Sequence, residues 1–363
     1  MSSGELFKAT SNLARGNRIY ILMLTAIIAV NLFSALGALH KEKEAAHIGK
    51  KLSKSVIRKE MLADEKRLKE ILEQKKFLTA VLTVSVFLVM LALALGLALS
   101  IKCLALKLNG RDFMAAYGFS PDINWYLWDV CKVVIIFYFF GYTLQFFELI
   151  GLRAFGAKKP DEHIMAIINT TIMDTLAFVA VLYFVIKKYK RRFIDLGISF
   201  KNLTRDIKIG ILGYLALLPI LSLILLIVFV ILQLIKYEPP SVPLFELFYE
   251  ETRPRLLFVL TILVTVIGPV AEEVFFRGFA YPVLRKRFGV RNAIILISFV
   301  FALLHTNIIG LLPIMALGVL LAYLYEKTGS LIPSITVHII HNFIIIYFVY
   351  LYKIIIMPTS CIY

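Results

Sequence analysis

Two adjacent glutamates and an arginine stand inside an otherwise apolar stretch, GPVAEEVFFRG at residues 268–278. An ionisable side chain inside a membrane helix costs roughly 2.5–3.5 kcal/mol on insertion scales, so these residues are candidates for function. Glu273 and Arg277 are four residues apart on one helix face and can form a buried, charge-assisted pair. Glu272 points about 100° away, as the 3.6-residue period requires. The pair does not account for Glu272, which is therefore the candidate general base.

Two further apolar stretches supply polar side chains at helical spacing. His305 follows Phe301 by four residues and projects from the helix face that Phe301 packs. His338 and Asn342 are also four residues apart and share one face. A helical bundle can bring Glu272 together with these residues in one pocket. The pocket would then hold a base, a second proton-handling group and two donors to a developing oxyanion.

The same residues raise the question of a metal. Glu272, His305 and His338 would offer zinc one carboxylate and two imidazoles, with water in the fourth position. The sequence has no H-E-x-x-H motif, and three separate helices contribute these residues. We therefore favour a reaction without metal or other cofactor, in which a glutamate activates water, and keep zinc as the alternative.

The elements that must position these residues are membrane helices. Hydrophobic residues make up 60% of the 363-residue chain and charged residues only 18%, which excludes ordinary soluble domains. Runs of about 20 residues that are nearly free of charge are long enough to cross the hydrocarbon core. They lie at 19–39, 77–101, 128–152, 164–186, 209–235, 256–280, 292–306, 308–326 and 331–352. The sequence thus predicts an all-α, polytopic bundle of eight or nine transmembrane helices, in which 292–326 is either two short helices or one broken helix.

A charged stretch separates the first two spans. Residues 40–76 contain 12 basic and 7 acidic residues, with apolar positions near helical spacing. This pattern predicts an amphipathic helical arm outside the bilayer core, either solvated or bound to headgroups or a partner. The predicted organisation is an N-terminal part, 1–127, that includes the arm, and a membrane core, 128–363, with the chemical residues between 255 and 352.

The formal net charge of +16 indicates the partners of the chain. The basic residues lie just beyond the apolar runs, where lysine and arginine fix topology and contact anionic headgroups. The expected partner is therefore membrane lipid and not nucleic acid. The chain is expected to be a multi-pass protein of a bacterial cell membrane or an endomembrane.

Three motifs in order, E-E-x-x-x-R at 272–277, F-x-x-x-H at 301–305 and H-x-x-x-N at 338–342, resemble the CPBP family. These are intramembrane proteases related to the CAAX-prenyl endopeptidases and to bacteriocin-processing and self-immunity proteins. The resemblance covers residues 255–352. It implies an intramembrane endopeptidase that acts on a peptide or a prenylated protein, by CAAX-type processing or by processing of a secreted peptide.

The resemblance also implies a role for each residue. Glu272 would be the catalytic glutamate and would share the activation of water with His305. Glu273 and Arg277 would support the geometry of their helix. His338 and Asn342 would stabilise the tetrahedral oxyanion.

Two other functions are compatible with these residues. In a non-catalytic immunity or scaffold protein, the polar cluster would only hold helices together and Glu272→Gln would be tolerated. In a transporter or channel, the carboxylates would form a proton relay, which predicts an internal repeat of the carboxylate motif. The sequence shows no such repeat.

Overall fold

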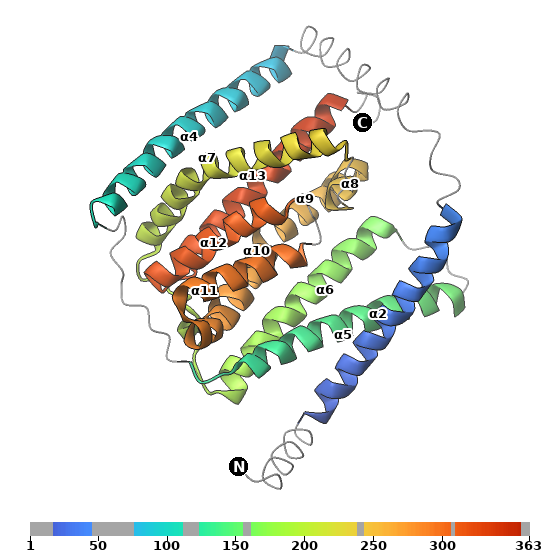
Figure 1. The fold of residues 1–363 in the computed structure, drawn as a ribbon. Coiled ribbons are helices and arrows are strands. Elements are labelled where there is room, and N and C mark those ends of the chain that lie inside the picture. The colour runs from blue at the N-terminus through green and yellow to red at the C-terminus, as the bar shows by residue number, and fades with distance from the viewer. Residues whose placement is uncertain are drawn as a thin grey trace. The chain divides into compact units, whose positions relative to one another are not determined.

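The computed structural model describes residues 17–45, 76–111, 123–154, 161–237, 243–305 and 309–356, and most of these residues are helical (Figure 1). No strand occurs in these ranges, so the all-α prediction is confirmed. Most of the predicted arm at 40–76 lies outside the described residues. The helices are α2 (Arg18–Ala45), α4 (Lys76–Leu108), α5 (Leu127–Ala154), α6 (Glu162–Leu182), α7 (Leu203–Ile235), α8 (Pro243–Glu250), α9 (Pro254–Ile262), α10 (Gly268–Glu273), α11 (Tyr281–Leu304), α12 (Leu311–Thr328) and α13 (Ile332–Ile356).

Seven helical segments in the described part of the chain are long and apolar enough to cross a membrane. One of them is a 51-residue segment, Pro254–Leu304, which contains the predicted span 256–280 and all but the last two residues of 292–306. The segment breaks at Gly289, whose φ of 75° and ψ of 170° are outside the helical region. Residues 292–326 belong to two helices and not to one broken helix, because α11 ends at Leu304 and a separate helix, α12, begins at Leu311.

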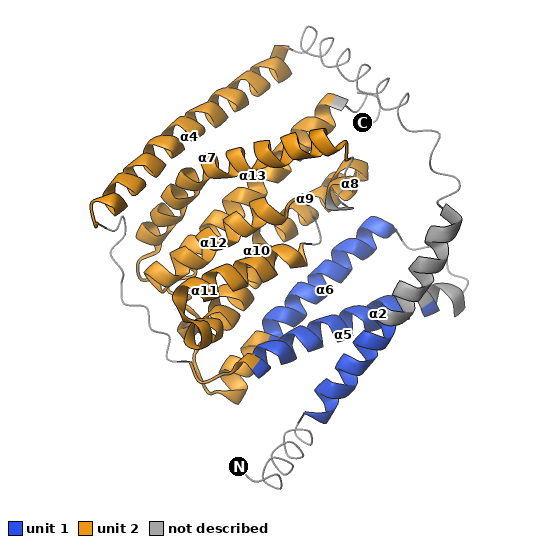
Figure 2. Cartoon of the chain, viewed as in Figure 1, with its two compact units in different colours: residues 1–66, 128–180 blue, residues 67–127, 181–363 orange. Residues whose placement is uncertain are grey.

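The chain divides into two compact units (Figure 2). Unit 1 is residues 1–66 and 128–180, and unit 2 is residues 67–127 and 181–363. Within unit 1, the Tyr142 hydroxyl on α5 donates a hydrogen bond to the amide oxygen of Asn31 on α2, over 3.0 Å. All the candidate site residues belong to unit 2. The predicted division between residues 127 and 128 stays a prediction.

Helices α7, α12 and α13 of unit 2 pack together in a hydrophobic core. Its buried members come from α7, α12 and α13 and are Tyr214, Leu217, Leu221, Leu317, Leu321, Leu324 and Val337. Gly210 allows α7 and α13 to approach closely, since a Cβ there would lie 2.8 Å from the carbonyl oxygen of Pro333. The position of α13, which carries His338, therefore depends on α7.

A proline inside α7 explains how α4 packs against it. Pro219 has no N–H, so the carbonyl oxygen of Leu215, four residues earlier, loses its usual helical partner. Gly96 of α4 lies directly against that oxygen. One turn along α4, the Ser100 hydroxyl donates to the carbonyl oxygen of Ala216 over 2.6 Å. Gly96 and the Ser100 hydroxyl of α4 thus pack against the irregular turn of α7.

We expect Gly96→Ala to destabilise unit 2. The added Cβ would lie 2.2 Å from the Leu215 oxygen and 3.0 Å from the Pro219 ring, and overpacking of this kind costs about 1–3 kcal/mol. Thermal unfolding in detergent should show a lower midpoint. Ala98→Val, at an exposed position of the same helix, is the control and should leave the midpoint unchanged. Equal midpoints for the two variants would contradict this account.

Candidate active site

Glu272 and Glu273 lie between two π-helical segments. The short α10 follows the π-helix η3 (Leu263–Ile267) and precedes the π-helix η4 (Val274–Ala280). π-Helical turns are rare and often occur at functional sites. Their wider turns also change the rotation per residue, so a 3.6-residue wheel does not describe every side chain in this region. The four-residue spacing of Glu273 and Arg277 nevertheless brings them together.

A fully buried ion pair is the centre of the site. Arg277 Nη1 donates to Glu273 Oε1 over 2.6 Å, and neither side chain is exposed. The guanidinium also lies 4.4 Å from the centre of the Phe301 ring, within the range of a cation–π interaction. Breaking a buried pair leaves an uncompensated charge, which costs more than the pair contributes. Glu273 and Arg277 must therefore be considered together.

Glu273 has a second partner on α13. His338 Nδ1 lies 2.9 Å from Glu273 Oε1, the same oxygen that accepts from Arg277. A carboxylate only accepts, so Nδ1 carries the proton of this hydrogen bond. The other ring nitrogen of His338, Nε2, lies 3.8 Å from Glu272 Oε2. His338 thus connects the two glutamates.

Glu272 differs from its neighbour in exposure. Its side chain is 36% exposed, whereas that of Glu273 is fully buried. Its Oε2 atom is nevertheless buried and has no hydrogen-bond partner. A buried polar atom of this kind needs an explanation, and an active site is one of the common explanations. The side chain of Glu272 is therefore partly exposed and carries an oxygen that can accept a proton.

His305 joins this cluster through an aromatic ring. Its Nδ1 lies 2.8 Å from the carbonyl oxygen of Phe301, which can only accept, so Nδ1 carries a proton. Nε2 of a neutral ring is then an acceptor. The Phe301 ring is fully buried and lies 4.6 Å from the His305 ring and 5.7 Å from the His338 ring, measured between centres. The Phe301 ring thus contacts the rings of both histidines.

Asn342 is bonded to η3, the π-helix that precedes the two glutamates. Its side-chain amide donates to the carbonyl oxygen of Val264, in η3, over 2.8 Å. This bond occupies one of the two N–H groups that the amide offers. Asn342 therefore links α13 to the π-helix that precedes Glu272.

The structure adds two residues to those that the sequence predicts for this region. Phe301 was expected only to pack, whereas its ring contacts Arg277, His305 and His338. Tyr214 of α7 was not among the predicted residues, and its hydroxyl lies 3.1 Å from Nδ1 of His341, which follows His338 by three residues on α13. Phe301 could have been found from its place in the F-x-x-x-H motif. Tyr214 gives no signal in the sequence, because it lies in an ordinary apolar run.

Zinc fits this arrangement poorly. Its ligand atoms lie about 2 Å from the ion, so they must converge. Within the described ranges, the donor atoms of Glu272, His305 and His338 do not all come within 4.8 Å of one another. In this geometry, the three residues do not form a zinc ligand set.

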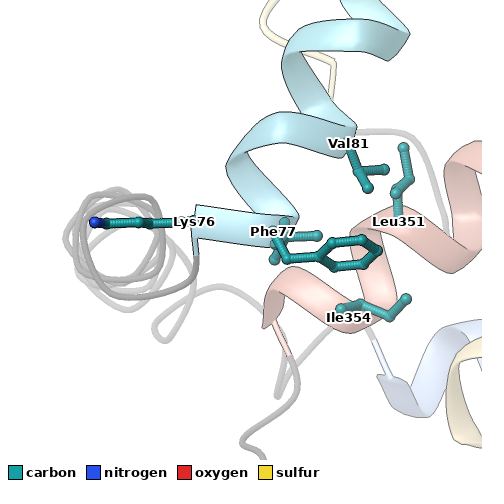
Figure 3. Close-up of a pocket in the computed structure, with 6 residues that line it drawn as sticks. Lys76, Phe77, Val81, Leu351 and Ile354 are labelled. Carbon is teal, nitrogen blue, oxygen red and sulfur yellow. The ribbon is translucent and has the colours of Figure 1, made fainter.

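An apolar cavity of about 490 Å³ lies elsewhere in unit 2, between the start of α4 and the end of α13 (Figure 3). Phe77, Val81, Leu351 and Ile354 line it, while the amino group of Lys76 points away from it. Leu351 is 13 residues after His338, or roughly 20 Å along the helix. The cavity exposes no polar atoms and has no part in the chemistry of the glutamates.

Comparison with known proteins supports one family. The family model described as "Type II CAAX prenyl endopeptidase Rce1-like" matches residues 254–344. This range contains Glu272, His305, His338 and Asn342 as well as the buried ion pair. No curated protein and no solved structure matches the chain. The match is consistent with the CPBP family that the three motifs resemble.

We expect Arg277→Ala to unfold unit 2 more readily, because Glu273 would stay buried without its partner. The expected cost is about 3–5 kcal/mol, as for other broken buried pairs. The double variant Glu273→Gln/Arg277→Met removes both charges and should recover most of the loss. Thermal unfolding in detergent tests this, with the exposed Arg255→Ala as the control. An Arg277→Ala protein as stable as the wild type would show that the pair is not structural.

Proposed function

We propose that this chain, whose residues 254–344 carry a Rce1-like type II CAAX prenyl endopeptidase domain, hydrolyses a peptide bond of a membrane-associated substrate with Glu272 as the general base. The observation that carries the proposal is the partly exposed Glu272 carboxylate, whose buried oxygen has no hydrogen-bond partner and lies 3.8 Å from His338 Nε2. The family match supports an intramembrane endopeptidase. The roles of the individual residues are our inference from geometry.

The proposed reaction uses particular protonation states at the site. Arg277 balances the charge of the fully buried Glu273, whereas Glu272 is partly exposed. Nδ1 of His338 donates to Glu273 and Nε2 faces Glu272, so a second proton on His338 makes Nε2 a donor as well. The proposed mechanism takes Glu272 as a carboxylate and His338 as an imidazolium.

The reaction then follows from these states. Glu272 takes a proton from a water molecule, and the resulting hydroxide attacks the carbonyl carbon of the scissile bond. Nε2 of His305 accepts the other hydrogen of that water and orients it, since Nδ1 donates to Phe301. General-base catalysis of this kind contributes typically 10²–10⁴-fold. When the C–N bond breaks, the proton on Glu272 passes to the leaving amine.

The negative charge moves from Glu272 to the substrate oxygen during the attack, so the net charge of the site is unchanged. The imidazolium of His338 can donate to that oxyanion from Nε2. The second N–H of Asn342, which Val264 does not use, is the other candidate donor. Loss of one such donor typically costs 10²–10³-fold in kcat.

The substrate class rests on the family match. The family description names CAAX prenyl endopeptidases, so we propose a prenylated protein whose C-terminal residues are removed. A membrane-bound peptide with a leader is the alternative substrate. We propose a reaction without metal for either substrate, because the donor atoms of Glu272, His305 and His338 do not converge.

The decisive test is cleavage of a fluorogenic prenylated CAAX peptide by the purified protein in detergent, with and without a strong zinc chelator. Wild type should cleave in both conditions, and Glu272→Gln should be inactive although it folds normally. Glu250→Gln, at an exposed glutamate of α8, should retain full activity. Activity in Glu272→Gln would refute the assignment of the base. Loss of wild-type activity on chelation would refute the metal-free mechanism but not the endopeptidase.

His305→Ala should lower kcat by roughly 10²-fold or more, because the attacking water loses its acceptor. The melting temperature should change little, since the His305 side chain is exposed. Single-turnover cleavage and thermal unfolding measure the two effects separately. Parallel losses of stability and activity would mean that His305 is structural.

A further inference from the structure

The segment between α6 and α7 carries a dense run of positive charge. Five of the six residues 187–192 are lysine or arginine, and Lys201 follows. We call residues 187–202 the basic loop. It contains six basic residues and one acidic residue, Asp195, which lies 3.5 Å from Arg192. The basic loop therefore presents a strong net positive charge.

Exposed apolar side chains accompany these cations. Lys187, Lys190 and Lys201 are exposed, and so are Ile194 at 48% and Phe200 at 69%. The amino group of Lys188 lies 4.8 Å from the centre of the Tyr189 ring. Long cationic side chains beside aromatic and aliphatic ones are typical of a membrane–water interface, where the charge reaches the headgroups and the apolar part stays in the acyl region.

The surrounding end of unit 2 is also basic. Arg285, Lys286, Arg287 and Arg291 flank the break at Gly289, and Arg285 bonds to Glu326 near the end of α12. The carboxylate of Asp206 at the start of α7 is paired with Arg205. The carboxylates described here are thus each bound to a neighbouring arginine. Lys187, Lys190 and Lys201 of the basic loop are exposed at this end.

The basic loop contacts three segments next to the candidate site, namely η4, α12 and the residue before α13. The carbonyl oxygen of Leu196 accepts from the Tyr325 hydroxyl over 3.0 Å, and that of Gly197 accepts from the backbone N–H of Leu331 over 2.8 Å. Leu196 also packs on Gly278, where a Cβ would lie 3.2 Å from its carbonyl oxygen. Gly278 directly follows Arg277, and Leu331 precedes His338 by seven residues. A shift of the loop would therefore move both sides of the site.

We propose that the basic loop binds anionic phospholipid headgroups, and that this binding holds η4 and α13 in the arrangement that cleavage requires. Headgroups are favoured over a soluble anion because the cations lie at the ends of membrane spans, among exposed apolar side chains. Each cation near an anionic surface contributes roughly fivefold in affinity. The effect on cleavage rests on the proposed function, whereas lipid binding does not.

The test compares two triple variants of the full chain. Lys187→Gln/Lys190→Asn/Lys201→Gln removes three exposed charges from the basic loop. Asn is used at residue 190 because its φ is 55°, a region that asparagine tolerates. The matched control, Lys76→Gln/Lys236→Asn/Arg255→Gln, removes three exposed charges at the opposite end, where Lys236 has a φ of 53°.

Bound lipid is measured by native mass spectrometry after titration with phosphatidylglycerol. The loop variant should bind it at least tenfold more weakly than wild type, and the control variant should bind it as wild type does. Equal binding by both variants would overturn the proposed site. Glu272→Gln should bind as much lipid as wild type, so this readout is valid even for an inactive protein.

Cleavage is measured in vesicles of phosphatidylcholine alone and in vesicles in which a third of the lipid is phosphatidylglycerol. The anionic lipid should raise the kcat of wild type and should not raise the kcat of the loop variant. The expected increase is roughly fivefold, which is at the low end of the coupling usually found between two sites. High salt should reduce the effect by screening. A wild-type kcat that does not depend on anionic lipid would overturn the coupling. Absence of cleavage in every sample, with lipid binding as expected, would instead count against the endopeptidase.

Discussion

One carboxylate oxygen, Oε1 of Glu273, accepts hydrogen bonds from two different helical segments. Arg277 in η4 and His338 in α13 both donate to it, and all three side chains are buried. A buried arginine needs an acceptor, and a buried imidazole is oriented by one. Because the same oxygen accepts both hydrogen bonds, it fixes the distance between α13 and η4 at this point. The direction in which His338 presents Nε2 to Glu272 follows from this contact.

Polar contacts continue along the same face of α13. Asn342 donates to Val264, the Tyr350 hydroxyl lies 2.8 Å from that of Thr261, and the Lys353 amino group donates to the carbonyl oxygen of Phe248. Lipid tails are as apolar as leucine, so apolar burial alone does not fix how two membrane helices align. A row of specific hydrogen bonds does fix this alignment. Polar contacts along α13 therefore set the register that brings Glu272 opposite His338.

The sequence could predict what depends on local spacing. The helical class and the approximate spans follow from charge-free runs, and Glu273 and Arg277 pair because they are four residues apart. The contact between Glu273 and His338 could not be derived in this way, because it depends on the register of two segments 65 residues apart. The π-helical turns around Glu272 have no sequence signal that we recognise, and the role of Val264 depends on them. The three motifs in order were informative because they mark residues that make such contacts.

The segment that matches the family model does not build the site alone. Tyr214 of α7, which bonds to His341, and Leu196 of the basic loop, which packs on Gly278, both precede residue 254. Close approaches such as that of Gly210 to Pro333 tolerate no added methyl group without movement. The candidate site residues thus lie within 254–344, whereas part of their alignment comes from α7 and from a loop at the basic end of unit 2. That end of unit 2 is therefore connected to the candidate site through packing.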